Sequence, residues 1–329
     1  MKFLKGLFHI VLLTFFEDKI ATKFMRNTGW LLFEQIFRMG LSLVVTSLMA
    51  RYLGAEDFGM LNYGLAYIII FTTVSNLGID SIIVNEIIKN REDTGKIIGT
   101  TLYLRFISSV ISIFSIFMIV KFFDASNNTI QVITCIQSFS LLFIVFDSIG
   151  YWFQSNLQSK YIVIAKSVAF VIVSVWRLAL IFLGKSIEYF AVATVIEAII
   201  MSAFIFIFYT RFEAPKLRYS FQTAKQLLSQ CYHFLIAGIL IMVYTQIDKI
   251  MLGQMTGNTT VGVYSAALVI SSLWMFIPNA LIHSARPLIM ASKNQDEDLY
   301  IKRNKQLYCS IIWIGIGASI VITLFSKPI

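Results

Sequence analysis

The sequence predicts an all-α membrane protein, a polytopic bundle of about nine transmembrane helices. Of the 329 residues, 57% are hydrophobic and only 14% are charged, whereas a soluble domain carries roughly 25% charged residues. The apolar residues also form uninterrupted runs, each long enough for the ~20 residues that cross a bilayer as a helix. Runs without alternation exclude the strands of a membrane barrel. These uncharged runs are Phe58–Ile79, Ala125–Phe146, Gln226–Ile247, Ile250–Ala285 and Gln306–Ser326.

Hydropathy places the predicted helices in order along the chain. A stretch before the first helix has Lys2 and Lys5 followed by eleven apolar residues, which are too few to span a bilayer. No small-residue cleavage site follows it, so we interpret this leader as a cytoplasmic segment that is partly an interfacial amphipathic helix. The nine predicted spans lie near 28–50, 59–79, 98–120, 130–150, 161–183, 189–210, 231–252, 262–282 and 307–325.

The spans group into predicted domains. Residues 1–26 form the leader, and 27–210 form a first bundle of six helices. A polar, basic stretch at 211–230 is predicted to be a cytoplasmic linker. Residues 231–329 then supply three helices that begin a second bundle.

The distribution of Lys and Arg predicts the orientation. Of the 27 cations, 18 fall in segments that are inside if the N-terminus is cytoplasmic, five fall within spans, and four fall outside: Arg51, Lys121, Lys185 and Lys327. This bias alternates correctly at every loop, as the positive-inside rule requires. We therefore expect a multi-pass protein of the bacterial cytoplasmic (inner) membrane. The net charge of +9 follows from this topology, and nucleic-acid binding is not expected.

The loops argue against an enzyme. The predicted outer loops 51–59, 121–129, 184–188 and 253–261 hold nine residues or fewer, which leaves no room for a catalytic domain. The inner loops show no Gly-rich phosphate cradle. No catalytic residues and no cofactor are therefore predicted. The three Cys and three His residues are dispersed, so no metal site is expected either.

Eight ionisable residues fall within or at the edge of predicted spans, where a charge costs a few kcal/mol. Glu34 and Arg38 are four residues apart and can pair on one helix face. Lys166 and Arg177 are eleven residues apart, so they share a face about 16 Å apart along the axis. The charges either hold helices together as ion pairs or line a solvated, net-cationic cavity suited to an anionic cargo. The set comprises Arg38, Arg105, Lys166, Arg177 and Lys249, with Glu34, Glu197 and Asp248.

Two motifs carry a resemblance to a known family. The segment 49–59, which reads Met-Ala-Arg-Tyr-Leu-Gly-Ala-Glu-Asp-Phe-Gly, is followed by a span that ends at Asn76-Leu77-Gly78-Ile79-Asp80. It resembles the first hairpin of bacterial polysaccharide-unit flippases, the Wzx-type exporters of the multidrug/oligosaccharidyl-lipid/polysaccharide superfamily. The segment from Gln246 to Gly253, followed by 261–267, resembles the start of the second half in the same family. The two also resemble each other, since Leu53-Gly54 precedes Phe58-Gly59 much as Leu252-Gly253 precedes Val261-Gly262.

The resemblance implies a fold and a function. Six spans per repeat place two bundles in the same orientation, as a parallel repeat. Family members usually have twelve or more spans, so this chain is expected to be truncated at its C-terminus. The implied activity is flipping of undecaprenyl-pyrophosphate-linked oligosaccharide units from the inner to the outer leaflet. This step serves the synthesis of O-antigen and lipopolysaccharide, capsule or exopolysaccharide.

Roles for the intramembrane charges follow from that activity. The substrate-binding residues are expected to be Arg38, Arg105, Lys166, Arg177 and Lys249. Ion coupling, to H⁺ or Na⁺, is assigned to Glu34, Glu197 and Asp248. The expected partners are the polyprenyl-pyrophosphate-linked oligosaccharide, membrane lipid and other polysaccharide assembly proteins.

Several alternatives stay open. A drug or cation antiporter of the same superfamily needs a more acidic cavity. A flippase for the peptidoglycan precursor is a close relative that the sequence separates poorly. A polysaccharide polymerase needs a sizeable outer loop with catalytic residues, and a truncated remnant needs no function.

Overall fold

The computed structural model describes residues 19–212, 214–275 and 297–324, and isolated positions between 275 and 297. All secondary structure in these residues is helical, which confirms the all-α prediction. The chain divides into two compact units, Met1–Ser265 and Ala266–Ile329. Most of the predicted leader 1–26 lies outside the described residues.

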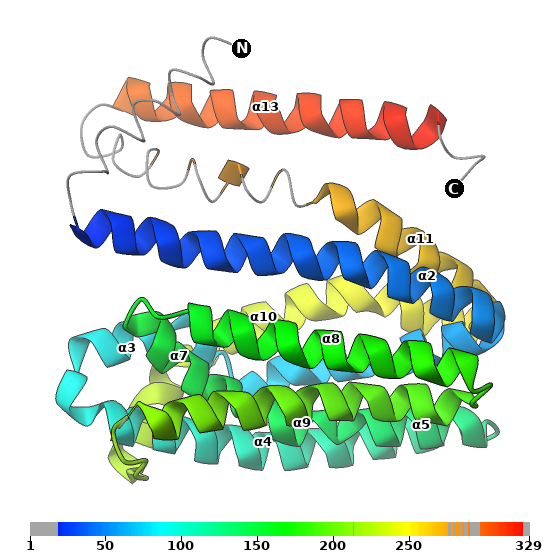
Figure 1. Cartoon of the computed structure of the whole chain (residues 1–329), viewed down its shortest axis with the longest axis horizontal. Helices are drawn as coiled ribbons and strands as arrows, with labels where there is room; N and C mark the ends of the chain where they lie inside the picture. The colour runs from blue at the N-terminus through cyan, green and yellow to red at the C-terminus, as the bar shows by residue number, and fades with distance from the viewer. Residues whose placement is uncertain are drawn as a thin grey trace. The chain divides into compact units, whose positions relative to one another are not determined.

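The first unit contains nearly all of the described helices. Within it, α8 packs against α9 and α2 packs against α4, α5, α8 and α10, and Figure 1 shows α8 and α9 side by side. The last turns of α11 and all of α13 belong to the second unit. The elements are α2 (Lys19–Asn76), η1 (Ile79–Ser81), α3 (Ile83–Lys89), η2 (Arg91–Asp93), α4 (Thr94–Phe123), α5 (Asn128–Ser138), α6 (Ser140–Ile144), α7 (Asp147–Ser155), α8 (Lys160–Phe182), α9 (Ile187–Arg211), α10 (Phe221–Thr256), α11 (Asn258–Trp274) and α13 (Glu297–Leu324).

Six helical stretches in the described residues are long and apolar enough to cross a membrane. Their outward faces carry large apolar side chains, including Phe114 and Val175, each 61% exposed, and Phe182, 89% exposed. Apolar surface on this scale is compatible with lipid rather than water as the surrounding medium. The chain is therefore a multi-pass membrane protein. The six stretches are Phe33–Asn76, Arg91–Phe123, Asn128–Ser155, Lys160–Phe182, Ile187–Arg211 and Phe221–Thr256.

The count of six differs from the nine predicted spans for identifiable reasons. The first two predicted spans fall in α2, where two helices joined at the non-helical residue Gly54 count as one stretch. The predicted spans 262–282 and 307–325 overlap α11 and α13, which are not among the six. Nine spans and a parallel repeat therefore stay predictions.

The fourth predicted span is broken into α5, α6 and α7 without any proline. At the first break, the hydroxyls of Ser138 and Ser140 donate to the backbone carbonyls of Cys135 and Gln137, each three residues earlier. At the same place the amide of Phe139 bonds the carbonyl three residues before it, as in a 3₁₀ turn. Serine bonds of this kind bend helices, and they account for a break that hydropathy does not predict.

Two glycines bend the chain in the same way. Gly54 in α2 has φ 76° and ψ 173°, and Gly257 between α10 and α11 has φ 93° and ψ 171°. This region of backbone conformation is accessible essentially to glycine alone. Each glycine lets one helix end and a second begin at once, and Figure 1 shows the α2 bend at the right of the view.

The helices that follow these bends touch backbone to backbone. A Cβ atom added to Gly262 of α11 would lie 1.9 Å from the carbonyl oxygen of Ala55 in α2. A Cβ added to Gly59 of α2 would lie 1.8 Å from the carbonyl oxygen of Asn258 in α11. The contact is reciprocal, and it tolerates no side chain on either glycine. We call this part of the first unit the Gly54 end.

The opposite end of the first unit holds the segment between α9 and α10, and we call it the linker end. Residues 214–220 are not helical, and they run along the first turns of α4. The amide of Arg218 donates to the carbonyl of Gly95 at 3.0 Å, and the amide of Ser220 donates to the hydroxyl of Thr100 at 3.0 Å. Since α10 begins at Phe221, half of the predicted linker 211–230 is helix.

Two apolar clusters fill the first unit, one near each end. The first includes Met60, Ile133 and Phe190, and the second includes Ile79, Ile149 and Phe153. In lipid the hydrophobic effect drives little association between helices, so close packing and interhelical hydrogen bonds hold the bundle. Polar side chains between the helices therefore matter for both structure and function.

Candidate functional site

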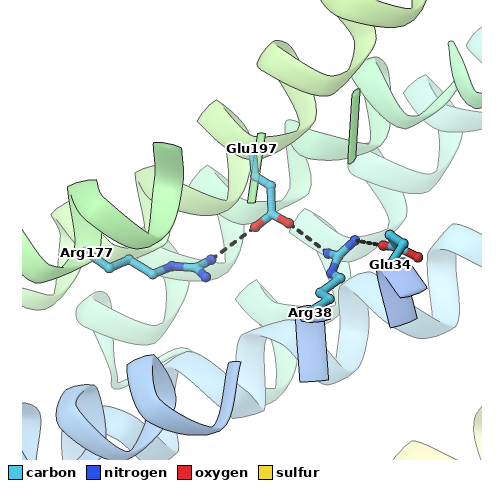
Figure 2. A network of polar contacts seen from close by, with 4 residues as sticks. All are labelled: Glu34, Arg38, Arg177 and Glu197. Atoms are coloured by element: carbon cyan, nitrogen blue, oxygen red, sulfur yellow. Dashed lines mark hydrogen bonds and ion pairs between the residues drawn. The ribbon is translucent and has the colours of Figure 1, made fainter. Parts of the chain in front are cut away.

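Four charged side chains form a chain of ion pairs inside the first unit, and we call them the Glu197 network (Figure 2). Glu197 lies between two guanidinium groups. One of its carboxylate oxygens accepts from Nη2 of Arg38 at 2.8 Å, and the other accepts from Nη2 of Arg177 at 3.4 Å. Glu34 lies 3.7 Å from Nη1 of Arg38. The spacing of Glu34 and Arg38 correctly predicted their pairing.

The network connects three elements at the depth of the membrane spans. Glu34 and Arg38 are on the part of α2 before the bend, Arg177 is on α8 and Glu197 is on α9. The Arg38 guanidinium also lies 4.9 Å from the ring centroid of Phe170 on α8, which is cation–π geometry. Because each cation has a carboxylate partner, these helices bury charge without leaving it unpaired.

The members of the network differ in exposure, and the difference has a chemical consequence. The side chain of Arg38 is 39% exposed, against 15–18% for the other three. Arg38 is therefore the most exposed member of the network, whereas Arg177 is enclosed. A phosphate can replace a carboxylate on a guanidinium because both offer paired oxygens to the planar donors.

Arg105 lies apart from this network. It is 1% exposed, and its guanidinium donates to the Ser148 hydroxyl at 2.7 Å and to the Asn76 carboxamide oxygen. These neutral acceptors sit on α7 and at the end of α2, so Arg105 joins three elements. Its Nε has no hydrogen-bond partner among the described residues. In this conformation Arg105 ties α4 to α7 and to the end of α2.

We expect Arg105→Lys to destabilise the protein nearly as much as Arg105→Gln. An ammonium group is a point charge that cannot reproduce the planar guanidinium between two acceptors. Removing hydrogen bonds to a buried charge costs about 1.5–3 kcal/mol. The thermal midpoint of the detergent-purified protein measures the effect. Equal midpoints for wild type and Arg105→Lys would show that the charge alone suffices.

The remaining predicted residues lie elsewhere. Asp248 accepts a hydrogen bond from the Tyr264 hydroxyl and another from the backbone amide of Lys249. Lys249 and Lys166 are partly buried, and neither has an ion pair within the described part of the chain. The structure thus brings together four of the eight predicted residues and leaves Arg105, Lys166, Asp248 and Lys249 outside. In the same residues, no three His, Cys, Asp or Glu side chains gather as metal ligands.

A polar cluster at the Gly54 end escaped the sequence analysis, and we call it the Tyr63 network. The Tyr63 hydroxyl donates to Oδ2 of Asp124 at 3.0 Å, while Nε2 of Gln254 donates to Oδ1 of Asp124 at 3.0 Å and to the Tyr63 oxygen at 2.6 Å. The Tyr67 oxygen lies 3.1 Å from that of Tyr63. Since Tyr63 gives its one proton to Asp124, Tyr67 is the donor.

The sequence held one signal for this cluster. Tyr63 and Tyr67 are four residues apart, which puts both hydroxyls on one helix face. Asp124 lies one residue beyond α4, where hydropathy reads it as loop. Burial raises the pKa of Asp124 above its ordinary value, and the hydrogen bonds from Tyr63 and Gln254 oppose that shift.

A pocket of about 200 Å³ opens at the linker end. Its lining mixes one cation with polar and apolar side chains, and it includes none of the eight predicted residues. The lining residues are Ile87, Ile88, Arg91, Thr94, Trp152, Ser155, Asn156 and Pro215.

Comparison with known families gives a match over most of the chain. A family profile described as "Polysaccharide biosynthesis protein" matches residues 24–292. The matched range includes the Glu197 network, the Tyr63 network and both glycine bends. Searches of curated proteins and of solved structures found no match.

Proposed function

Since the chain belongs to the polysaccharide biosynthesis protein family, we propose that it is a flippase for lipid-linked oligosaccharides. It moves undecaprenyl-pyrophosphate-linked repeat units from the inner to the outer leaflet of the bacterial cytoplasmic membrane. The product feeds synthesis of O-antigen and lipopolysaccharide, capsule or exopolysaccharide, with other assembly proteins acting downstream. The protein itself makes or breaks no covalent bond.

The observation that carries the proposal is the Glu197 network with Arg38 as its exposed member. Pyrophosphate and sugars cannot cross hydrocarbon unaided, because their polar groups lose hydration without replacement. A guanidinium at span depth supplies that replacement, and its carboxylate partners neutralise it when no cargo is present. In this proposal Arg38 meets the pyrophosphate first and Arg177 follows when the helices rearrange.

The other predicted residues take later roles in the same proposal. Arg105, Lys166 and Lys249 contact cargo only in conformations that differ from this one. Glu34, Glu197 and Asp248 exchange protons or Na⁺ as their cationic partners turn to the substrate. Coupling of this kind follows because a carboxylate that loses its ion pair at span depth favours binding a cation.

Two features support the proposed parallel repeat of the two bundles and the proposed orientation of the protein in the membrane. Gly54 and Gly257 have the same rare backbone conformation and each precedes a glycine of the reciprocal contact, as equivalent positions of a parallel repeat would. The repeat then pairs Gly54 with Gly257, not with Gly253. The linker end carries more basic residues than the Gly54 end, so we assign it to the cytoplasm together with the N-terminus. Its cations include Lys89, Arg91, Lys96, Lys160, Lys216 and Arg218.

Deleting the gene and measuring lipid-linked repeat units in each leaflet tests the function. We expect the units to accumulate in the cytoplasmic leaflet and surface glycan to disappear. Wild-type protein should restore both, and the Arg38→Glu variant should restore neither. Lys121→Gln, which removes a charge from an exposed side chain, is the matched control and should complement fully.

Other outcomes would replace the proposal. Unchanged lipid intermediates with altered sensitivity to cationic drugs would indicate the antiporter. Units that reach the outer leaflet and stay unpolymerised would indicate a polymerase.

A further inference from the structure

We propose that the Tyr63 network is a latch that holds the Gly54 end closed and must open in every transport cycle. The proposal rests on the proposed function in two respects, which are that the protein alternates between two conformations and that the Gly54 end faces the outside of the cell. Nothing in the family match concerns these residues individually.

The latch joins parts of the chain that lie far apart in sequence. Tyr63 follows the Gly54 bend in α2, Asp124 follows α4, and Gln254 is one turn before the Gly257 bend, near the end of α10. In the predicted two-bundle arrangement, Tyr63 and Asp124 belong to the first bundle and Gln254 belongs to the second. The two hydrogen bonds that Gln254 donates, to Asp124 and to Tyr63, therefore cross the boundary at which alternating access requires separation.

The packing around Tyr63 is tight on the α10 side. A Cβ atom added to Gly253 would lie 2.5 Å from two carbons of the Tyr63 ring, so the missing side chain is what lets the ring seat against α10. The adjacent Gln254 then bonds the hydroxyl of that ring. Tyr63 is 1% exposed and nearby Val261 of α11 is fully buried. The Gly54 end is thus closed in this conformation.

The bonds of the latch are of a kind that can be exchanged reversibly. The bonds from Tyr63 and Gln254 to the Asp124 carboxylate are charge-assisted, but the side chain of Gln254 is exposed, so water can compete for the bonds that it donates. Each net hydrogen bond contributes modestly, because water can replace it on opening. At the reciprocal contact of Gly59 and Gly262 the two backbones touch directly, so the helices can separate there without any side chain changing its rotamer. The Gly54 end therefore opens when the two hydrogen bonds donated by Gln254 are exchanged for hydrogen bonds to water.

Accessibility of Val261 measures opening without any substrate. Cys135, Cys231 and Cys309 are replaced by alanine, Val261→Cys is introduced, and a membrane-impermeant maleimide is added from outside intact cells. We expect Tyr63→Phe, and separately Gln254→Ala, to raise the labelling rate about five- to tenfold, as loss of one or two net hydrogen bonds implies. Thr259→Ala removes an exposed side chain of the same helix and should leave the rate unchanged. If both variants were labelled at the same rate as the Val261→Cys protein with Tyr63 and Gln254 intact, the proposal would be overturned.

A reversible lock provides the second measurement. Asp124→Cys with Gln254→Cys places two thiols where the wild-type side chains lie within hydrogen-bond distance. A bis-methanethiosulfonate reagent should crosslink them and stop transport, and a reductant should restore it. Continued transport by fully crosslinked protein would also overturn the latch. The labelling assay measures opening of the Gly54 end even if gene deletion shows that the cargo is not a glycan lipid. The latch and the flippase function can therefore fail independently of each other.

Discussion

Replacing Glu197 with glutamine should abolish glycan export and lower the thermal midpoint of the purified protein by roughly 4–5 °C. The substitution keeps the shape of the side chain but, among the described residues, leaves Arg38 with only Glu34 and Arg177 with no carboxylate. Breaking one partner from a buried ion pair costs about 3–5 kcal/mol, and we take the lower figure because Arg38 is partly exposed. With an unfolding entropy of about 2.1 cal/mol/K per residue, about 1 kcal/mol moves the midpoint of a chain of this length by roughly 1.5 °C. Fluorescence-detected unfolding in detergent and surface glycan in the complemented deletion strain measure the two effects.

A double variant separates the structural role of Glu197 from the transport role of its partners. Glu197→Gln with Arg177→Gln removes both the carboxylate and the enclosed guanidinium, so no guanidinium is left on α8 without its carboxylate. We expect the midpoint to recover by at least half, whereas export stays lost. Recovery of both would mean that the network only holds helices together. Glu92→Gln, on an exposed side chain, is the control for the loss of one negative charge.

Gly262→Ala should have the second large effect, loss of most correctly folded protein from the membrane. The new methyl group would lie 1.9 Å from the Ala55 carbonyl oxygen, and backbone cannot yield as the end of a flexible side chain does. Overpacking costs about 1–3 kcal/mol and occasionally more. Yield in the membrane, monitored through a fluorescent fusion, and the thermal midpoint report the change.

The chain offers a matched control for this substitution. Gly40 also lies within a helix, and a Cβ added there meets nothing within 4 Å. Gly40→Ala should leave yield unchanged or raise stability by about 0.5–1 kcal/mol, since alanine loses less backbone entropy than glycine in a helix. If Gly262→Ala behaved like Gly40→Ala, the close approach of α2 and α11 would be wrong.

Hydropathy predicted most helices because the membrane imposes a length and a polarity on each of them. The predicted spans 98–120 and 189–210 lie inside α4 and α9, and 161–183 ends one residue beyond α8. The bend of α2 was predicted as a loop at 51–59, since hydropathy does not show that one glycine suffices to turn the helix. The break at Phe139 was missed because it depends on serine hydrogen bonds.

Within the candidate site, the sequence could predict contacts between residues of the same helix but not contacts between different helices. The pair of Glu34 and Arg38 follows from their spacing in the sequence. The position of Glu197 between two arginines depends on how α9 packs against α2 and α8, which no local pattern encodes. The same limit applies to Arg105, whose neutral partners are revealed only by the packed helices. The predicted correspondence of Leu53-Gly54 with Leu252-Gly253 stays a prediction; Gly253 lies within helix α10, and the bend is at Gly257.

The docking of residues 214–220 on α4 fixes the start of α10 and determines which end of that helix moves most. Helix α10 has 36 residues and is therefore about 54 Å long. Because the segment before Phe221 is hydrogen-bonded to Gly95 and Thr100, the start of α10 is the point about which the helix would rotate. A rotation of only about 10° around it would sweep the far tip of a helix this long through about 9 Å. A small change in the angle of α10 at the linker end thus becomes a displacement as wide as a helix at the Gly54 end.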